Sequence, residues 1–140
     1  MTRDEIQAME ASPELDKLVG EKIFGYSIYH YDKDVPERCY YMLTDDKGDP
    51  VTPYEGWHTG ERKTEEEAWG DCPNYSEDIG AAWEVVEKLK EKYAVAVVSY
   101  KSSVLCKIQA PDSDSFDADS KTAPEAICKA ALIAEIGVEA

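Results

Sequence analysis

The stretch DCPNYSEDIGAAWEVVEKL, residues 71–89, decides the fold class because it predicts the most regular helix of the chain. Its apolar residues recur at intervals of three and four, which places them on one side of a helix: Ile79, Ala82, Trp83, Val86 and Leu89. We expect this stripe, Trp83 included, to pack in the core. Ser76 stands where a helix N-cap is expected, so we predict that its hydroxyl caps the helix.

The segments after this helix predict a small antiparallel sheet followed by a buried helix. YAVAVVSY (93–100) is rich in β-branched residues, and VLCKIQ (104–109) alternates after a KSS turn, so the two form a hairpin. We expect a third strand near Phe116. In TAPEAICKAALIAEIG (122–137), Thr122 and Glu125 form a capping box, and the helix that follows is apolar on most sides, which predicts deep packing.

Two helices are predicted at the start of the chain. TRDE (2–5) is a capping box, and Ser12 with Pro13 begins a second helix that extends to about Gly25. A helix pair, a hairpin and two further helices predict an α+β domain in which helices pack on a sheet. We expect one such domain over residues 1–140, since its length is typical of a single core.

Residues 26–72 have a different composition, rich in aromatics, Gly, Pro and charge, and we interpret them as an irregular or hairpin insertion in this domain. TDDKGDP (44–50) predicts a turn, which would pair RCYYML (38–43) with the segment after Pro50. KTEEEAW (63–69) begins with another Thr-x-x-Glu capping box and predicts a short helix.

The charge of the chain limits its partners. With 30 acidic and 15 basic residues, the formal net charge is −15, which opposes direct binding to nucleic acid because that affinity comes from Lys and Arg on phosphates. An array of carboxylates can instead imitate phosphates and occupy a basic groove on a protein. We expect no membrane span and no signal peptide. The widely spaced Cys39, Cys72, Cys106 and Cys128 fit reduced thiols in a cytoplasm.

Three of these motifs, in this order, resemble the phage ABA sandwich domain: MTRDEIQAMEASPELDKLVGEKIFG, PNYSEDIGAAWEVVEKL and DADSKTAPEAICKAALIA. They cover roughly residues 1–25 and 74–136. The resemblance implies a three-layer α/β/α sandwich with a small, largely antiparallel sheet, and a bacteriophage or prophage protein that acts in the cytoplasm of a bacterial host. It implies no catalytic residues, and residues 26–72 exceed the family pattern.

The sequence predicts no metal and no cofactor. Zinc ligands would have to come from His30, Cys39, His58 and Cys72, which lack paired CxxC or HxxxH spacing. DSDSFDAD (112–119) fails as a calcium loop at three positions, and we interpret it as a solvated acidic loop. No nucleophile motif is present, so we predict a protein that is not an enzyme. An enzyme would need a cleft that gathers two of those four His and Cys residues.

We therefore predict a non-enzymatic phage accessory protein that binds a host defence protein. In one mechanism it is an acidic mimic that occupies the nucleic-acid groove of a protein such as a CRISPR effector, using carboxylates within 61–91 and 112–119. The candidate surface residues are Glu65, Glu66, Glu67, Asp112, Asp114 and Asp117.

Two alternatives remain open. A sponge would enclose a nucleotide immune signal between the helix starts at Ser76 and Thr122, because helix N-termini hold phosphates, with Tyr75, Trp57 or Trp69 stacking on the base. The competing interpretation is that Ser76 and Thr122 only cap their helices. A structural phage module would instead form a homo-oligomer through the Tyr-rich insertion.

Overall fold

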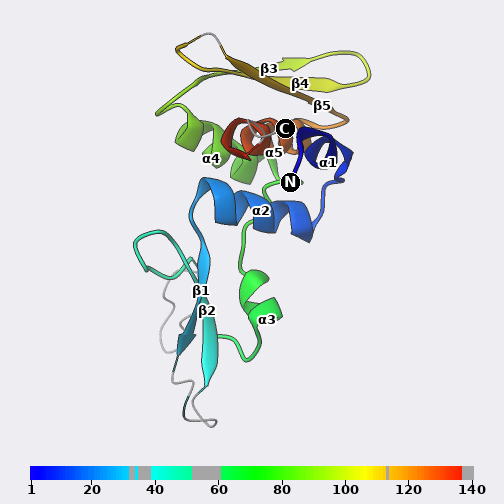
Figure 1. Cartoon of the computed structure of the whole chain (residues 1–140). Helices are drawn as coiled ribbons and strands as arrows, with labels where there is room; N and C mark the ends of the chain where they lie inside the picture. The colour runs from blue at the N-terminus through cyan, green and yellow to red at the C-terminus, as the bar shows by residue number, and fades with distance from the viewer. Residues whose placement is uncertain (32–33, 35–38, 52–60, 113, 137–140) are drawn as a thin grey trace. The chain divides into compact units, whose positions relative to one another are not determined.

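The computed structural model describes residues 1–31, 34, 39–51, 61–112 and 114–136. The chain forms two compact units (Figure 1). Unit 1 contains Met1–Ile23 and Pro73–Ala140, and unit 2 contains Phe24–Cys72. Unit 2 therefore nearly coincides with residues 26–72, the segment whose composition differs from that of the rest of the chain.

Unit 1 is built from four helices and one antiparallel sheet among its described residues. The helices are α1 (Arg3–Ala8), α2 (Pro13–Ile23), α4 (Ile79–Leu89) and α5 (Ala123–Ile136). The strands β3 (Ala94–Ser99), β4 (Val104–Gln109) and β5 (Ser115–Ser120) lie in the order β3-β4-β5. In Figure 1, α5 lies between this sheet and α2, with α4 and α1 beside it.

Helix α5 is the centre of unit 1. Every residue from Ala126 to Ala134 is buried, because strands β4 and β5 pack on it from one side while α4, α2 and α1 pack on the others. The inward side chains of the sheet, Cys106, Ile108 and Ala118, are buried as well. The prediction of a deeply packed last helix is confirmed, as is the third strand that contains Phe116.

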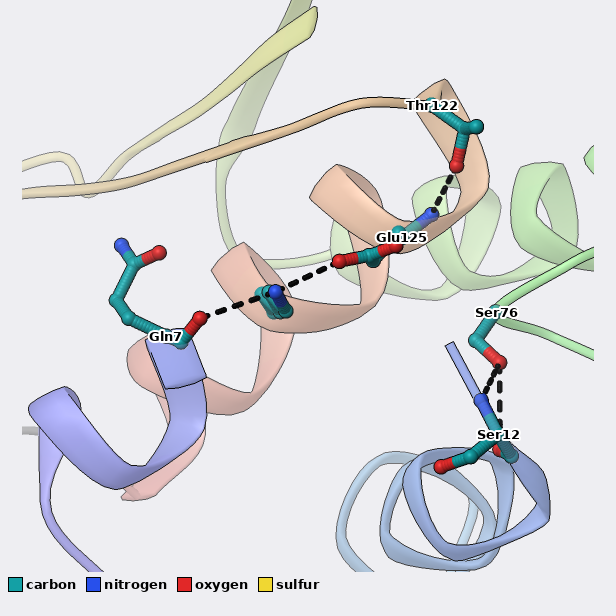
Figure 2. A network of polar contacts seen from close by, with 6 residues as sticks. Gln7, Ser12, Ser76, Thr122 and Glu125 are labelled. Atoms are coloured by element: carbon teal, nitrogen blue, oxygen red, sulfur yellow. Dashed lines mark hydrogen bonds and ion pairs between the residues drawn. The ribbon is translucent and has the colours of Figure 1, made fainter. Parts of the chain in front are cut away.

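Local capping sets most of the helix starts, as the sequence predicts. The hydroxyl of Thr2 accepts a hydrogen bond from Glu5 N at 3.2 Å, and that of Ser12 accepts from Leu15 N at 3.3 Å. Thr122 accepts from Glu125 N at 3.5 Å (Figure 2). These bonds satisfy backbone donors that the first helical turn leaves without a partner.

The prediction that Ser76 caps α4 is wrong. The N-cap of α4 is Asp78, whose carboxylate accepts a hydrogen bond from Gly80 N at 3.2 Å. Ser76 lies two residues earlier, and its side chain is fully buried. A serine near a helix start can either cap the helix or form a long-range hydrogen bond. The Ser76 side chain does the second.

Ser76 joins the segment before α4 to the first turn of α2. The Asp16 carboxylate, which is only 5% exposed, accepts from Ser76 N at 2.8 Å and from Ser76 Oγ at 2.6 Å. The same hydroxyl accepts a hydrogen bond from Ser12 N at 3.1 Å, as Figure 2 shows. A buried carboxylate is tolerated when it is hydrogen-bonded in this way. This joint fixes α2 against the loop that leads into α4.

The prediction that Trp83 belongs to the core is also wrong, although the helix itself is confirmed. Trp83 is 50% exposed and Ile79 is 53% exposed. The buried side of α4 consists of Ala82, Val85, Val86 and Leu89. Both stripes satisfy helical spacing and share three members, so packing against α5 selects the one that includes Val85.

Unit 2 is a hairpin with a short helix. Strands β1 (Ser27–Tyr31) and β2 (Tyr40–Thr44) pair antiparallel, and α3 (Glu65–Trp69) packs mainly on β2. The predicted turn after β2 is present: Gly48 has a φ of 83°, and the Asp45 carboxylate accepts hydrogen bonds from the backbone after it. The predicted helix cap at Thr64 is confirmed, because its hydroxyl accepts from Glu67 N at 3.1 Å.

The pairing predicted for β2 is present in part. The chain after the turn bridges Thr44 through Pro50 and Tyr41 through Arg62, with hydrogen bonds from Val51 N to Leu43 O and in both directions between Tyr41 and Arg62. The other edge of β2 pairs with β1, which the sequence does not predict.

One prediction about the acidic segment needs correction. Of the acidic segment 112–119, interpreted as a loop, Asp117 and Asp119 lie on β5. Pairing with β4 overrides the low strand propensity of aspartate there.

The predicted α+β class is confirmed, with helices and two small antiparallel sheets that are consistent with an ABA sandwich. In the part of the chain that the structure describes, every helix is too short or too polar to cross a membrane.

We expect Ser76→Ala to lower the free energy of unfolding by about 1–3 kcal/mol, because it removes hydrogen bonds from a buried carboxylate and a buried N–H. Ser120→Ala is the matched control. The Ser120 hydroxyl is also buried but has no hydrogen-bond partner among the described residues, so its loss should change stability by less than about 0.5 kcal/mol. Urea unfolding of both variants measures this, and equal effects would contradict the role assigned to Ser76.

Stability should also fall at alkaline pH because of Cys106. Burial, with a smaller contribution from Asp117, raises the pKa of the Cys106 thiol from 9.0 to about 12. Between these values the unfolded chain releases a proton that the folded chain keeps, so unfolding becomes more favourable as the pH rises. Urea unfolding at pH 8 to 11 should show the stability difference between wild type and Cys106→Ala narrowing, by at most about 1.4 kcal/mol per pH unit. A constant difference would contradict the assignment.

Candidate functional site

The exposed side of α4 presents two large apolar side chains to solvent. Ile79 and Trp83 are one helical turn apart, so their side chains are neighbours on the surface. Gly80 lies three residues before Trp83 and carries no side chain that would cover the ring. A Cβ at Gly80 would meet nothing closer than the Asp78 carboxylate at 3.6 Å. We call Ile79, Gly80 and Trp83 the tryptophan patch.

Carboxylates surround the tryptophan patch. Residues 77–91 contain five acidic residues and two lysines. Glu77, Asp78 and Glu84 are exposed close to the patch. Towards the end of the helix the charges are paired, because Lys90 lies 3.3 Å from Glu87 and Lys88 lies 4.0 Å from Glu91. Exposed pairs of this kind contribute little to stability, so their side chains can exchange partners cheaply.

A half-exposed tryptophan among carboxylates has the chemistry of a binding surface. Trp is favoured at the energetic centres of interfaces, where its large ring fills a pocket on the partner. Its ring face also attracts Arg and Lys, the same groups that pair with the surrounding carboxylates. The surface therefore fits a basic partner that contains an apolar pocket.

The predicted acidic surface is divided between the two units. Glu65, Glu66 and Glu67 are exposed in the first turn of α3 in unit 2. Asp112 and Asp114 are exposed in the turn before β5 in unit 1, where Asp114 N donates to the Asp112 carboxylate at 3.3 Å.

Asp117 differs from these carboxylates because it lies on a strand. It is half-buried on β5 and accepts a hydrogen bond from Ser115 Oγ at 3.1 Å. The carboxylates predicted for one mimic surface therefore lie on elements of both units.

Two of the residues predicted to enclose a nucleotide are buried within unit 1. Tyr75 and Ser76 are 0% exposed and present no surface to a ligand. Thr122 is exposed at the start of α5, whereas Trp69 is half-buried on α3 in unit 2. Trp57 lies outside the described residues.

Two hollows in unit 1 lie elsewhere. One, of about 500 Å³, is lined by residues 90–94 and 109–111. The other, of about 170 Å³, is lined by Lys22, Lys88 and Lys92 among others. Neither hollow includes Ser76 or Thr122.

Unit 2 brings together two of the four His and Cys residues that the sequence singles out. His30 Nε2 lies 2.8 Å from Cys39 Sγ, and the His30 ring stacks on Tyr41 with ring centroids 4.3 Å apart. His58 lies outside the described residues, and Cys72 is half-buried. Among the residues with described positions, no group of three His, Cys, Asp or Glu side chains is placed to hold a metal ion.

Neither the tryptophan patch nor the His30–Cys39 contact is predicted from the sequence. Trp83 has the spacing of a core residue, and the only sign against it is the equally good stripe that contains Val85. His30 and Cys39 are brought together by the register in which β1 pairs with β2, whereas the sequence predicts only the partner on the other edge of β2.

The fold and the composition define a small acidic α+β protein. The sequence profile of the Phage ABA sandwich domain matches residues 17–132, so the chain belongs to this phage protein family. A crystal structure described as a phage protein from Bacillus cereus ATCC 14579 is similar: it is 29% identical, with a TM-score of 0.56, over 93% of this chain and 92% of that one. None of the curated proteins compared with the chain matches it.

Trp83→Ala should lower the free energy of unfolding by less than about 1 kcal/mol, because the ring is half exposed and Ala is the better helix former. Leu89→Ala, on the buried side of the same helix, should cost about 2–5 kcal/mol because it leaves a cavity. Urea unfolding of the two variants measures the contrast. A larger loss for Trp83→Ala than for Leu89→Ala would place Trp83 in the core.

Proposed function

We propose that this chain is a non-enzymatic phage accessory protein that binds a basic surface on a host protein through the tryptophan patch and its carboxylates. The observation that carries the proposal is the exposure of Trp83 and Ile79 on a helix whose charged residues are mainly acidic. A protein with no partner gains nothing from leaving these two side chains in water, since burying each would contribute about 1.5–3 kcal/mol.

The partner we propose is the nucleic-acid groove of a defence protein, such as a CRISPR effector. Such a groove is lined by Lys and Arg that contact phosphates, and carboxylates can replace those phosphates. A phage protein made inside the host cell would meet defence proteins with such grooves there. The net charge of −15 makes the approach to a basic groove electrostatically favourable.

The two alternatives fare differently. The nucleotide sponge loses Tyr75 and Ser76 as ligand contacts, since both are fully buried. A homo-oligomeric structural module keeps some support, because the tryptophan patch would also serve as a contact between copies. Light scattering distinguishes this use: an oligomer that dissociates in Trp83→Ala would assign the patch to self-association.

The test is capture from a lysate of host bacteria that carry defence systems, with the full chain immobilised. We expect a nucleic-acid-binding protein to be retained, and its capture to fall about tenfold or more between about 50 and 300 mM salt. An added oligonucleotide should compete for it. Trp83→Ala and Glu84→Lys should each reduce capture about tenfold, because they remove an anchor or reverse a charge at the patch.

Glu14→Lys is the matched control, since it makes the same charge change at an exposed position on α2. It should reduce capture much less than Glu84→Lys. Equal losses for the two reversals would mean that overall charge, and not the tryptophan patch, drives the binding. Capture that is insensitive to salt and to the oligonucleotide would contradict the acidic mimic.

A further inference from the structure

The β1–β2 hairpin places a thiol beside a base. His30 is paired with Tyr41 across the two strands, and Cys39 precedes Tyr41 by two residues, which puts all three side chains on the same face of the hairpin. The result is the distance of 2.8 Å between His30 Nε2 and Cys39 Sγ. This contact depends on strand register, and it is independent of the tryptophan patch.

The His30 imidazole is held in position, and the His30–Cys39 pair is open to solvent. The His30 ring stacks on the Tyr41 ring at an interplanar angle of 16°, which restricts rotation of the His30 side chain. His30 is exposed and Cys39 is half-buried, so a small molecule can reach the sulfur. A nucleophile and a base within hydrogen-bond reach, with the base oriented by a third group, is the arrangement that activates cysteine.

Two of the other thiols are in the opposite situation. Cys106 and Cys128 are fully buried, and burial raises the pKa of Cys106 to about 12. The thiolate is the reactive form of cysteine, so a buried and protonated thiol reacts slowly. These two side chains serve as internal references within the same molecule.

We propose that Cys39 is a modification site, at which the thiol reacts with hydrogen peroxide or a similar small electrophile while His30 accepts its proton. With peroxide, the Cys39 sulfur attacks one oxygen, an S–O bond forms and the O–O bond breaks. The leaving hydroxide takes the proton held by His30 and becomes water. The cysteine is oxidised to a sulfenic acid and the peroxide is reduced to water, which balances the reaction without a further reactant.

The experiment measures alkylation of each cysteine by iodoacetamide at pH 7, in the full chain with Cys72→Ser so that Cys39 is the only thiol that is not fully buried. Peptide mass spectrometry gives the initial rates. We expect Cys39 to react at least about tenfold faster than Cys106 and Cys128, and faster than glutathione in the same solution. Addition of hydrogen peroxide with dimedone should label Cys39 before the other two.

His30→Phe distinguishes the effect of the base from the effect of ring stacking. Its phenyl ring can still stack on Tyr41, but it accepts no proton. It should lower the rate at Cys39 by about tenfold or more. Tyr41→Phe keeps the stack and the base, and it should leave the rate within about twofold. Circular dichroism confirms that each variant is folded. An unchanged rate in His30→Phe, or a wild-type rate no higher than that of glutathione, would overturn the proposal.

Discussion

The structure of unit 1 depends on the burial of α5 over its whole circumference. Strands β4 and β5 take one side of this helix, and α4, α2 and α1 take the others, so each element is positioned by its contact with α5. Even its lysine is buried: Lys129, 4% exposed, donates to Gln7 O at 3.0 Å and to Glu125 Oε1 at 2.8 Å. A buried ammonium needs such partners, and the hydrogen bond to Gln7 O joins α1 to α5.

Packing on α5 also determines what the protein shows to solvent. Helix α4 turns Val85 and Leu89 towards α5, and this rotation leaves Trp83 on the surface between carboxylates. Just before α4, the hydrogen bonds from Ser76 to the Asp16 carboxylate hold the segment that leads into the helix. The candidate binding surface is therefore a consequence of how the core is assembled.

Unit 2 carries different chemistry on a smaller scaffold. A five-residue register between β1 and β2 sets the His30–Cys39 contact, and a short helix displays three consecutive glutamates. Because the two units have separate cores, a change in the hairpin can alter the thiol while the tryptophan patch stays intact. Membership of the phage ABA sandwich family specifies the fold, whereas the function of an individual member depends on the surfaces that it presents.

The α+β class, the helices, the β3-β4-β5 strands and the caps at Thr2, Thr64 and Thr122 can be predicted from the amino-acid sequence alone. Those caps join residues three positions apart, so local chemistry settles them. Tertiary packing is needed to establish the role of Ser76, the exposure of Trp83, the pairing of β1 with β2 and the contact between His30 and Cys39. Ser76 bonds a carboxylate 60 residues away, and the other three depend on which surfaces pack together. Periodicity leaves such choices open because two stripes or two strand partners fit it equally well.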